Sequence, residues 1–415
     1  MKKTICELFA GIGGFRLGFE RLGADWETVW FNQFEPGTKK QWAHDCYVKH
    51  FGDCMDINGE YHTNEDICTV NKSSIPDHTF LVAGFPCQDY SVAKSSAEGI
   101  EGKKGVLWWQ IYEILKEKQP PFCIFENVDR LIKSPTKQRG RDFGIILACL
   151  AKLGYCAEWR IVNAAKYGSP QKRKRIFIFA YRADTEYALK MKNVSDEEII
   201  SAQGFMAKAF PVKSASAVST TALNDDIAAV SDNFSFDFQN SGYMYNHMVY
   251  TAKVIEKEAA KSMLFDVLEE NADAKYEISD DKFDRWKYLK GAKKIPRKSK
   301  TGFEYIYSEG AVPFPDILNQ PARTILTSEA SVNRSSHVVY DIHSEKLRTL
   351  TPVETERLQG FDDNWTNTGM TERMRYFCMG NSLVVPMVTR MAKVLDDILN
   401  TENKKTPIEH KKTLC

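Results

Sequence analysis

The sequence predicts an α/β fold, in which helices cover both faces of a mostly parallel sheet, with a smaller, irregular second domain. The first 180 residues alternate short apolar, strand-like segments with segments of helical spacing, and this alternation is typical of βαβ units. The alternation ends after Tyr181, and 415 residues exceed the usual size of one domain. No run of about 18 apolar residues occurs, which excludes an ordinary transmembrane helix.

Each expected element follows from the spacing of its apolar residues. Strands are expected at residues 4–9, 28–31, 80–83, 122–125 and 176–181, and helices at 15–22, 107–115 and 145–153. Later segments with helical spacing are 250–270, 345–361 and 384–399, the last of them amphipathic. The polar tail from residue 401 is expected to be mobile.

The composition narrows the class of protein. Apolar residues make up 43% and charged residues 27%, which is ordinary for a soluble globular protein. The ten cysteines include no C-x-x-C pair, which favours free thiols in a reducing compartment over a zinc ribbon or a disulfide framework. Glu7 interrupts the apolar N-terminal segment, so no signal peptide is expected. The net charge of +1 means that nucleic-acid binding would depend on local basic patches.

A glycine-rich turn follows the first expected strand. Gly11, Gly13 and Gly14 would let a ligand approach backbone N–H groups at the start of a helix. Arg16 stands where G-x-G-x-x-G has its third glycine, so a plain glycine turn fits as well as a nucleotide-like site. Glu35, beyond the second strand, suits ribose hydroxyls, although a surface carboxylate is the simpler interpretation.

Chemically capable side chains stand at the ends of later strands. Cys87, in Gly-Phe-Pro-Cys-Gln, could be a nucleophile, because ligands bind at the carboxyl ends of parallel strands; a small buried side chain is the alternative. Glu126 begins Glu-Asn-Val after the next strand, where a helix cap or a solvated carboxylate would also fit. Gln171, Arg173 and Arg175 share one face of an extended segment, directed toward a site or toward solvent.

Together, these motifs resemble the DNA (cytosine-5)-methyltransferase family. In chain order, the matching motifs are "ELFAGIGGFRLGFE", "GFPCQDYS", "ENV", "QKRKR", "RTLTPVETERLQGF" and "GNSLVVPM". They cover residues 4–181 and 321–395, and 182–320 carries no motif. The resemblance implies a Rossmann-like domain that binds S-adenosylmethionine (SAM) and a target-recognition domain, with a DNA cleft between them. The expected parts are a catalytic domain at 1–184, a small target-recognition domain at 185–371, a helix returning to the catalytic domain at 372–400 and a tail at 401–415.

The resemblance also implies a cofactor site, at which S-adenosyl-L-homocysteine would be the product. Asp66 is similar to the residue that reads adenine N6, and Phe34 would stack on the adenine. The ribose would be bound by Gln33, where the family usually has Glu, or by Glu35. The other expected cofactor contacts are Phe9, Gly11, Ile12, Gly13, Gly14, Ile67, Pro86, Leu107, Asn381 and Ser382.

The chemistry of the reaction gives roles to four residues. Carbon 5 of cytosine becomes nucleophilic when a thiolate, here Cys87, adds at carbon 6. A protonated Glu126 at N3 would neutralise the charge that develops on the ring. Arg175 would bind O2, and Arg173 would support the site. The cytosine must be flipped out of the duplex, because Cys87 cannot reach it inside the helix. No metal ion is expected.

Double-stranded DNA is the expected partner. Residues 285–300 carry eight basic side chains and no acid, which suits phosphate contacts, or else a solvated loop. The expected DNA contacts are Gln88, Ser91, Asn127, Gln171, Lys293, Lys294, Arg297 and Lys298.

The expected enzyme is a monomer of the bacterial cytoplasm or nucleoid, without membrane attachment, and its activity does not require a cognate restriction endonuclease. One alternative is an RNA cytosine-5 methyltransferase, although the Cys-Phe-Thr tripeptide of the tRNA-modifying relatives is absent. Another is a non-catalytic DNA-binding relative, which the intact Cys87 and Glu126 disfavour.

Overall fold

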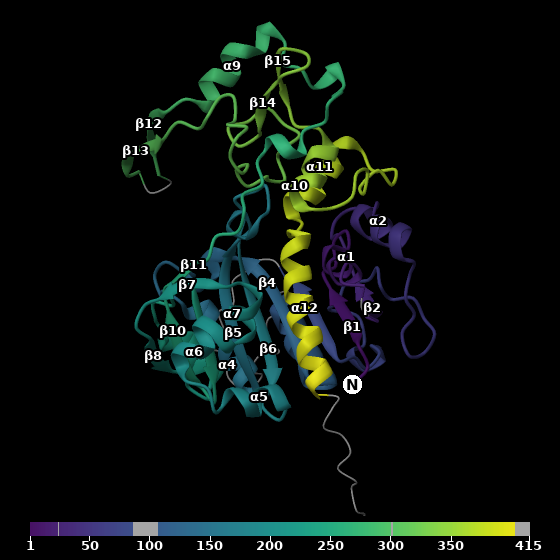
Figure 1. The fold of residues 1–415 in the computed structure, drawn as a ribbon, viewed down its shortest axis with the longest axis vertical. Helices are drawn as coiled ribbons and strands as arrows, with labels where there is room; N and C mark the ends of the chain where they lie inside the picture. Colours follow the sequence, from purple (N-terminus) through teal and green to yellow (C-terminus); the bar gives the residue numbers. More distant parts are fainter. Residues whose placement is uncertain (24, 86–106, 300–301, 403–415) are drawn as a thin grey trace, which may run out of the picture. The chain divides into compact units, whose positions relative to one another are not determined.

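The chain divides into two units (Figure 1). The computed structural model describes residues 1–23, 25–85, 107–299 and 302–402. Unit 1 holds residues 1–163, 174–257 and the chain from 386 onward, and unit 2 holds 164–173 and 258–385. The domain boundary expected at residue 185 therefore differs from the one in the structure. Residues up to 257 stay with unit 1, because strands in this stretch continue the sheet of that unit by backbone hydrogen bonds.

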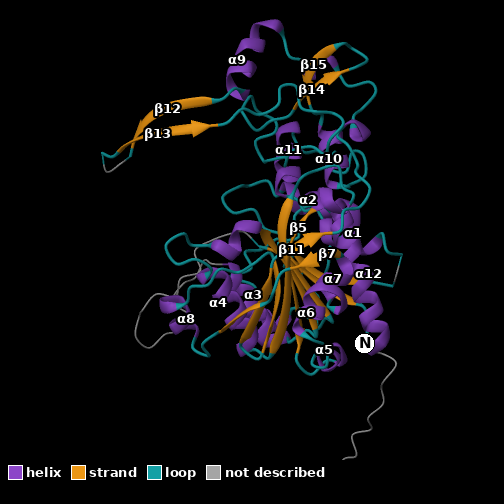
Figure 2. Cartoon of the chain, turned by 60° about the vertical axis from the view of Figure 1, so that its left-hand side comes forward, coloured by secondary structure: helices purple, strands orange, loops and turns teal. Residues whose placement is uncertain are grey.

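The parallel half of the central sheet confirms the expected βαβ alternation. Its strands lie in the order β2-β1-β3-β4 and are all parallel, so their carboxyl ends meet at one edge. The strands are largely buried, since helices α3 and α4 cover one face of the sheet and α1 and α12 the other (Figure 2). The strand bounds are β1 Thr4–Leu8, β2 Glu27–Asn32, β3 Phe80–Gly84 and β4 Phe122–Val128. The helix bounds are α1 Gly14–Glu20, α2 Trp42–Phe51, α3 Leu107–Lys118, α4 Arg141–Lys152 and α12 Val385–Glu402.

The other half of the sheet is antiparallel, which corrects the expectation of a mostly parallel sheet. The order continues β6-β5-β9-β10-β8, and each of these strands runs antiparallel to its neighbours. A second, two-stranded sheet pairs β7 with β11. The strand bounds are β5 Tyr155–Asn163, β6 Lys174–Arg182, β7 Val212–Ala215, β8 Ser219–Ala222, β9 Ser241–Tyr245, β10 Met248–Ala252 and β11 Val254–Glu256. The helix bounds are α5 Glu186–Met191, α6 Asp196–Glu198, α7 Phe205–Ala209 and α8 Ile227–Asn233.

The expected helix at 250–270 is wrong. Its first part forms β10 and β11, which are rich in β-branched Val, Thr and Ile and pair with other strands of unit 1. The extended sheet is held by buried polar groups as well as by apolar packing. Arg160 is fully buried in β5 and donates to the carbonyl oxygen of Met206 at 3.1 Å and to the Ser241 hydroxyl at 3.2 Å. These bonds tie the helices over this half to the sheet.

In the described residues, unit 2 combines two hairpins with the α-helices α9, α10 and α11 and short 3-10 turns. The expected helix at 345–361 is correct only in its second half. Residues 346–349 form a strand, and α10 begins at Pro352 after a capping box between Thr351 and Glu354. The bounds are α9 Asp280–Lys290, β12 Lys293–Lys298, β13 Glu304–Glu309, β14 Val338–Asp341, β15 Lys346–Thr349, α10 Pro352–Gln359 and α11 Glu372–Asn381.

The helix that the amphipathic pattern predicted at 384–399 is present as α12, and it contacts α1 and the residue before β1 in unit 1. In α12 the Thr389 hydroxyl donates to the carbonyl oxygen of Gly18 at 2.9 Å, and Asp396 pairs with Lys3 at 2.6 Å. Through the described ranges, every helix is too short or too polar to cross a lipid bilayer.

Candidate active site

The glycine turn between β1 and α1 has an unusual backbone. Phe9, Gly11 and Gly13 all have positive φ, at 54°, 57° and 86°. A Cβ on Gly13 would lie 2.3 Å from the Phe51 ring, so only glycine fits there. A Cβ on Gly11 would meet no atom within 4 Å, so the space beside this residue is open. The turn therefore leaves room for a ligand next to its backbone.

The structure distinguishes Gln33 from Glu35. Gln33 Oε1 accepts the backbone N–H of Gly11 at 2.7 Å, so this side chain lies against the glycine turn. Glu35 Oε2 instead accepts the N–H of Ala43 at 2.9 Å at the start of α2, and partial burial raises the pKa of Glu35. Gln33 is therefore the residue at the turn, whereas Glu35 caps a helix.

The remaining expected cofactor residues are partly described. Phe34 is 36% exposed next to Gln33. Asp66 is exposed and accepts the N–H of Cys68 at 3.0 Å, while Ile67 is buried in the core. Leu107 is the first residue of α3. Pro86 lies outside the described residues, as do Cys87, Gln88 and Ser91, and Asn381 and Ser382 belong to unit 2.

Glu126 and Arg175 form an ion pair on neighbouring strands. Arg175 Nε lies 2.8 Å from Glu126 Oε1, and their side chains are only 19% and 13% exposed. Glu126 is the register partner of Gly84 at the end of β3, and a Cβ built on Gly84 would lie 3.6 Å from Glu126 Oε2. Asn127, which is buried, donates from Nδ2 to the carbonyl oxygen of Phe85 at 2.9 Å. The chain just before Cys87 is thus held beside the carboxylate.

Gln171 and Arg173 are buried within unit 2, whereas Arg175 belongs to unit 1. Arg173, 1% exposed, donates to the carbonyl oxygens of Gly380 at 3.0 Å and Ser382 at 2.6 Å. Gln171 is fully buried, and its Oε1 accepts the N–H of Ile325 at 3.1 Å. This burial argues against Gln171 as a direct DNA contact. Both side chains instead hold backbone groups of unit 2, and Gly380 and Ser382, which Arg173 binds, belong to the motif "GNSLVVPM".

Comparison with known proteins decides the family. Residues 3–397 match the model of the C-5 cytosine-specific DNA methylase family. The chain belongs to this family. It is 46% identical to the Type II methyltransferase M.Sau3AI of Staphylococcus aureus over 410 residues, with 97% of each chain covered. It is 28% identical to the Type II methyltransferase M.DsaV of Dactylococcopsis salina, with 96% of this chain and 88% of that protein covered.

A solved structure agrees with this methylase at the level of the fold. The crystal structure of S. pombe Dnmt2 methyltransferase matches with a TM-score of 0.58 at 15% identity, covering 96% of this chain and 99% of that one. The Rossmann-like methyltransferase fold predicted from the motifs is therefore confirmed. The family match and the 46% identity to M.Sau3AI show that the chain is a DNA (cytosine-5) methyltransferase.

The basic segment of the methylase forms the end of α9 and the first strand of the β12–β13 hairpin, and its charge is partly compensated. Lys293 Nζ lies 3.5 Å from Glu309 Oε2, and Lys298 Nζ lies 3.6 Å from Glu304 Oε1. The basic segment contains no acid in its own sequence, but two of its lysines lie within ion-pair distance of Glu304 and Glu309 on the opposite strand. Lys290, also in that run, is 1% exposed, and burial lowers its pKa to about 8, so it is not placed to contact a phosphate.

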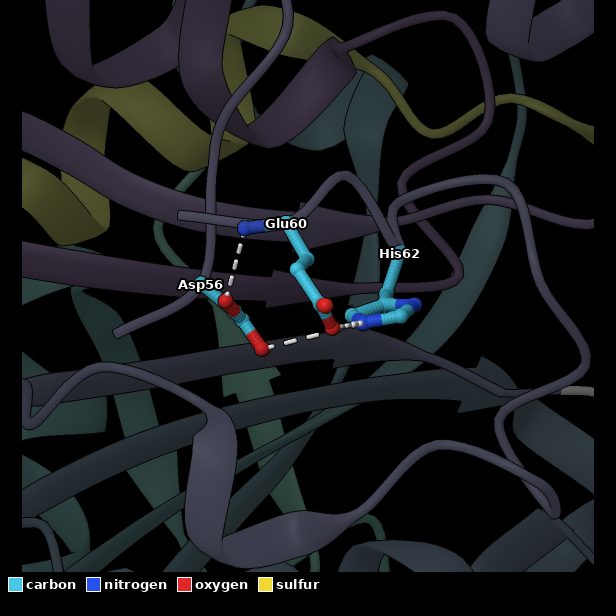
Figure 3. Close-up of side chains that lie close together, drawn as sticks. All are labelled: Asp56, Glu60 and His62. Carbon is cyan, nitrogen blue, oxygen red and sulfur yellow. Dashed lines mark hydrogen bonds and ion pairs between the residues drawn. The ribbon is translucent and has the colours of Figure 1, made fainter. Parts of the chain in front are cut away.

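A cluster of Asp56, Glu60 and His62 resembles a metal site in composition (Figure 3). Asp56 Oδ1 already accepts the backbone N–H of Glu60 at 3.0 Å, which closes a turn. Both ring nitrogens of His62 face carboxylates, Nε2 at 2.9 Å from Glu60 and Nδ1 at 3.0 Å from Glu65. The bond to Glu65 is the main reason that the pKa of His62 is raised, which favours a charged imidazolium. Ion pairing within the loop accounts for this cluster.

A buried polar pair beneath the glycine turn was not foreseen from the sequence. Glu7 in β1 is fully buried, its Oε2 accepts the Tyr47 hydroxyl at 3.0 Å, and burial raises the pKa of Glu7 to about 8. The Tyr47 ring stacks on Phe31 at 3.9 Å between centroids and approaches the Cβ position of Gly13. The sequence signal for this pair was a glutamate, Glu7, inside an otherwise apolar strand. In the sequence analysis Glu7 served only as an argument against a signal peptide.

Proposed function

We propose that this methylase transfers a methyl group from SAM to carbon 5 of a flipped-out cytosine within a specific sequence of double-stranded DNA, through a covalent bond between Cys87 and carbon 6. The observation that carries the proposal is the Glu126–Arg175 pair at 2.8 Å, beside the end of β3 that leads to Cys87. Addition to a pyrimidine ring needs a nucleophile, an acid and a cation. Here Glu126 and Arg175 lie on adjacent strands, beside the end of the strand that leads to Cys87.

The chain's own groups carry the addition step. The Cys87 thiolate forms a bond to carbon 6, and the electron pair of the 5,6 double bond shifts to carbon 5. Glu126 delivers a proton to N3, while Arg175 donates to O2, so the negative charge does not accumulate on the ring. After methyl transfer a water molecule takes the proton from carbon 5, and the electron pair left behind re-forms the 5,6 double bond. The carbon–sulfur bond breaks to release the Cys87 thiolate, and Glu126 recovers its proton from N3.

The cytosine must leave the base stack before this step. Flipping costs a few kcal/mol in lost stacking and pairing, and contacts to the DNA backbone offset that cost. Lys294 and Lys298 are exposed on unit 2 and suit this role. The names of M.Sau3AI and M.DsaV describe Type II methyltransferases, and we infer the same class here, acting as a monomer in the cytoplasm.

The glycine turn fits the cofactor. SAM supplies an electrophilic methyl group when it is bound. The open space beside Gly11 and the positive φ of Gly11 and Gly13 suit a ligand that packs against backbone. Gln33 would bind the ribose through the amide that now contacts Gly11, and Phe34, Asp66 and Ile67 would hold the adenine. Phe9, Ile12, Gly14, Pro86, Leu107, Asn381 and Ser382 are the other proposed contacts.

The variant Gln33→Ala is expected to weaken SAM binding about tenfold, because it removes a hydrogen-bonding group at the ribose and releases the Gly11 N–H. Titration calorimetry with SAM measures this. Gln33→Glu keeps an oxygen for Gly11 and should bind at least as tightly as the natural protein. Equal SAM affinity in the alanine variant would assign the ribose to another side chain.

A direct assay tests the function. Purified protein with tritiated SAM should label duplex DNA and leave tRNA unlabelled, and conversion sequencing should place the new methyl groups on cytosine at one recurring site. Labelling of tRNA in preference to DNA would support the RNA alternative. A protein that binds DNA but labels neither substrate would be the non-catalytic relative.

A further inference from the structure

The β12–β13 hairpin is fixed at its base. Arg334 donates to the carbonyl oxygens of Gly291 and Gly310, which flank the two strands of the hairpin. The buried Lys290 donates from Nζ to the carbonyl oxygen of Arg334 at 3.1 Å and lies 5.4 Å from the centroid of the Trp286 ring. The hairpin itself extends away from the rest of unit 2 (Figure 2). The hairpin is thus a protruding two-stranded ribbon whose base is fixed by hydrogen bonds to unit 2.

The surface of the hairpin is suited to a partner. Ile306 is 68% exposed and Phe303 is 70% exposed, so two large apolar side chains of the hairpin face solvent. Opposed residues of an antiparallel pair share a face, so Lys294, Ile306 and Lys298 lie on one face of the ribbon, and Arg297 lies on the other. Among the described residues, Lys294 has no carboxylate within ion-pair distance.

Arg297 lies over an aromatic ring on the same face of the hairpin. Its guanidinium carbon lies 3.9 Å from the centroid of the Tyr307 ring. Tyr307 is itself fixed, because its hydroxyl donates to Glu309 Oε1 at 2.8 Å. Arg297 is exposed and makes no ion pair within the described part of the chain. A stacked guanidinium loses little conformational freedom when its edge binds two acceptors at once.

We propose that the β12–β13 hairpin enters the major groove of the target duplex and that Arg297 reads a guanine there. The major groove admits a two-stranded ribbon, and the guanidinium edge donates two parallel hydrogen bonds to guanine O6 and N7. Lys294 and Lys298, on the opposite face, contact phosphates. The inference rests on the proposed function and deepens it, since it names the side chain that sets part of the sequence specificity.

The test compares Arg297→Ala and Arg297→Lys with the natural protein on duplexes randomised around one cytosine. Conversion sequencing of the methylated products gives the base preference at every position. Arg297→Ala should lower the preference for guanine at one position about 10- to 100-fold. Arg297→Lys should also lose most of it, because lysine keeps the charge but not the planar fork. Arg373→Ala, at another exposed arginine of unit 2, is the matched control and should keep the preference.

The position of Tyr307 gives a second readout. Tyr307→Phe keeps the stacking platform and should keep most of the preference, whereas Tyr307→Leu should lose part of it. An Arg297→Lys variant with the natural preference, or an Arg297→Ala variant that is weaker at all sites equally, would reduce Arg297 to a phosphate contact and overturn the inference. If the natural protein methylates no cytosine in the pool, the proposed function itself fails, which is a different result.

Discussion

Cys87→Ser is expected to lower methyl transfer by roughly a thousandfold or more, because the serine hydroxyl is a far weaker nucleophile toward carbon 6 than a thiolate. Binding to duplex DNA should persist, since the change removes one sulfur atom and no basic side chain. Tritiated methyl transfer measures the first effect, and a gel-shift titration measures the second.

Covalent trapping sharpens this prediction. Duplex DNA with 5-fluorocytosine at the target should give an SDS-stable complex with the natural protein, because fluorine cannot leave carbon 5 as a cation. The Cys87→Ser variant should give none. Cys54→Ser is the matched control: its thiol lies 3.8 Å from the carbonyl oxygen of Thr28, a contact that a hydroxyl can reproduce. Trapping that survives in Cys87→Ser would assign the nucleophile to another residue.

Glu126→Gln is expected to slow the single-turnover rate about 10²- to 10⁴-fold. The amide oxygen can still accept the Nε–H of Arg175, so the 2.8 Å contact is kept while the transferable proton is lost. The thermal midpoint should therefore change little, which separates a chemical effect from an unfolding effect.

Two companion variants complete this test. Glu117→Gln, exposed near the end of α3, removes a carboxylate that precedes the amino end of β4, whereas Glu126 lies near the carboxyl end of that strand, and it should leave the rate unchanged. Arg175→Lys keeps a cation near Glu126 and should lose less than Glu126→Gln, because O2 can still meet a charged donor. A natural single-turnover rate in Glu126→Gln would contradict the role of Glu126 as the acid at N3.

The parts of the site that are built from residues close together in sequence could be predicted from local patterns. The glycine turn, the strand that carries Glu126 and the amphipathic last helix each carry their signal within about a dozen residues. The capping box of Thr351 and Glu354 was also readable, and it would have placed the start of α10 correctly.

The rest depended on partners that are distant in sequence. Arg173 bonds to carbonyl oxygens of Ile325 and Gly380, so its burial could not follow from the local run of charges. The apolar pattern at 250–270 is compatible with a helix or with strands. Its first residues form a strand because β10 pairs with β9. Glu304 and Glu309 compensate the basic strand only because the hairpin folds back on itself.

The return of α12 to unit 1 has a consequence for synthesis of the protein. In chain order α12 follows unit 2, yet this helix bonds to Gly18 and Lys3 in unit 1. Nascent chains generally fold domain by domain from the N-terminus, but here the first unit stays incomplete until α12 has emerged from the ribosome. A chain cut short before α12 would leave apolar surface of unit 1 uncovered, so newly made enzyme should become active only after α12 has been made.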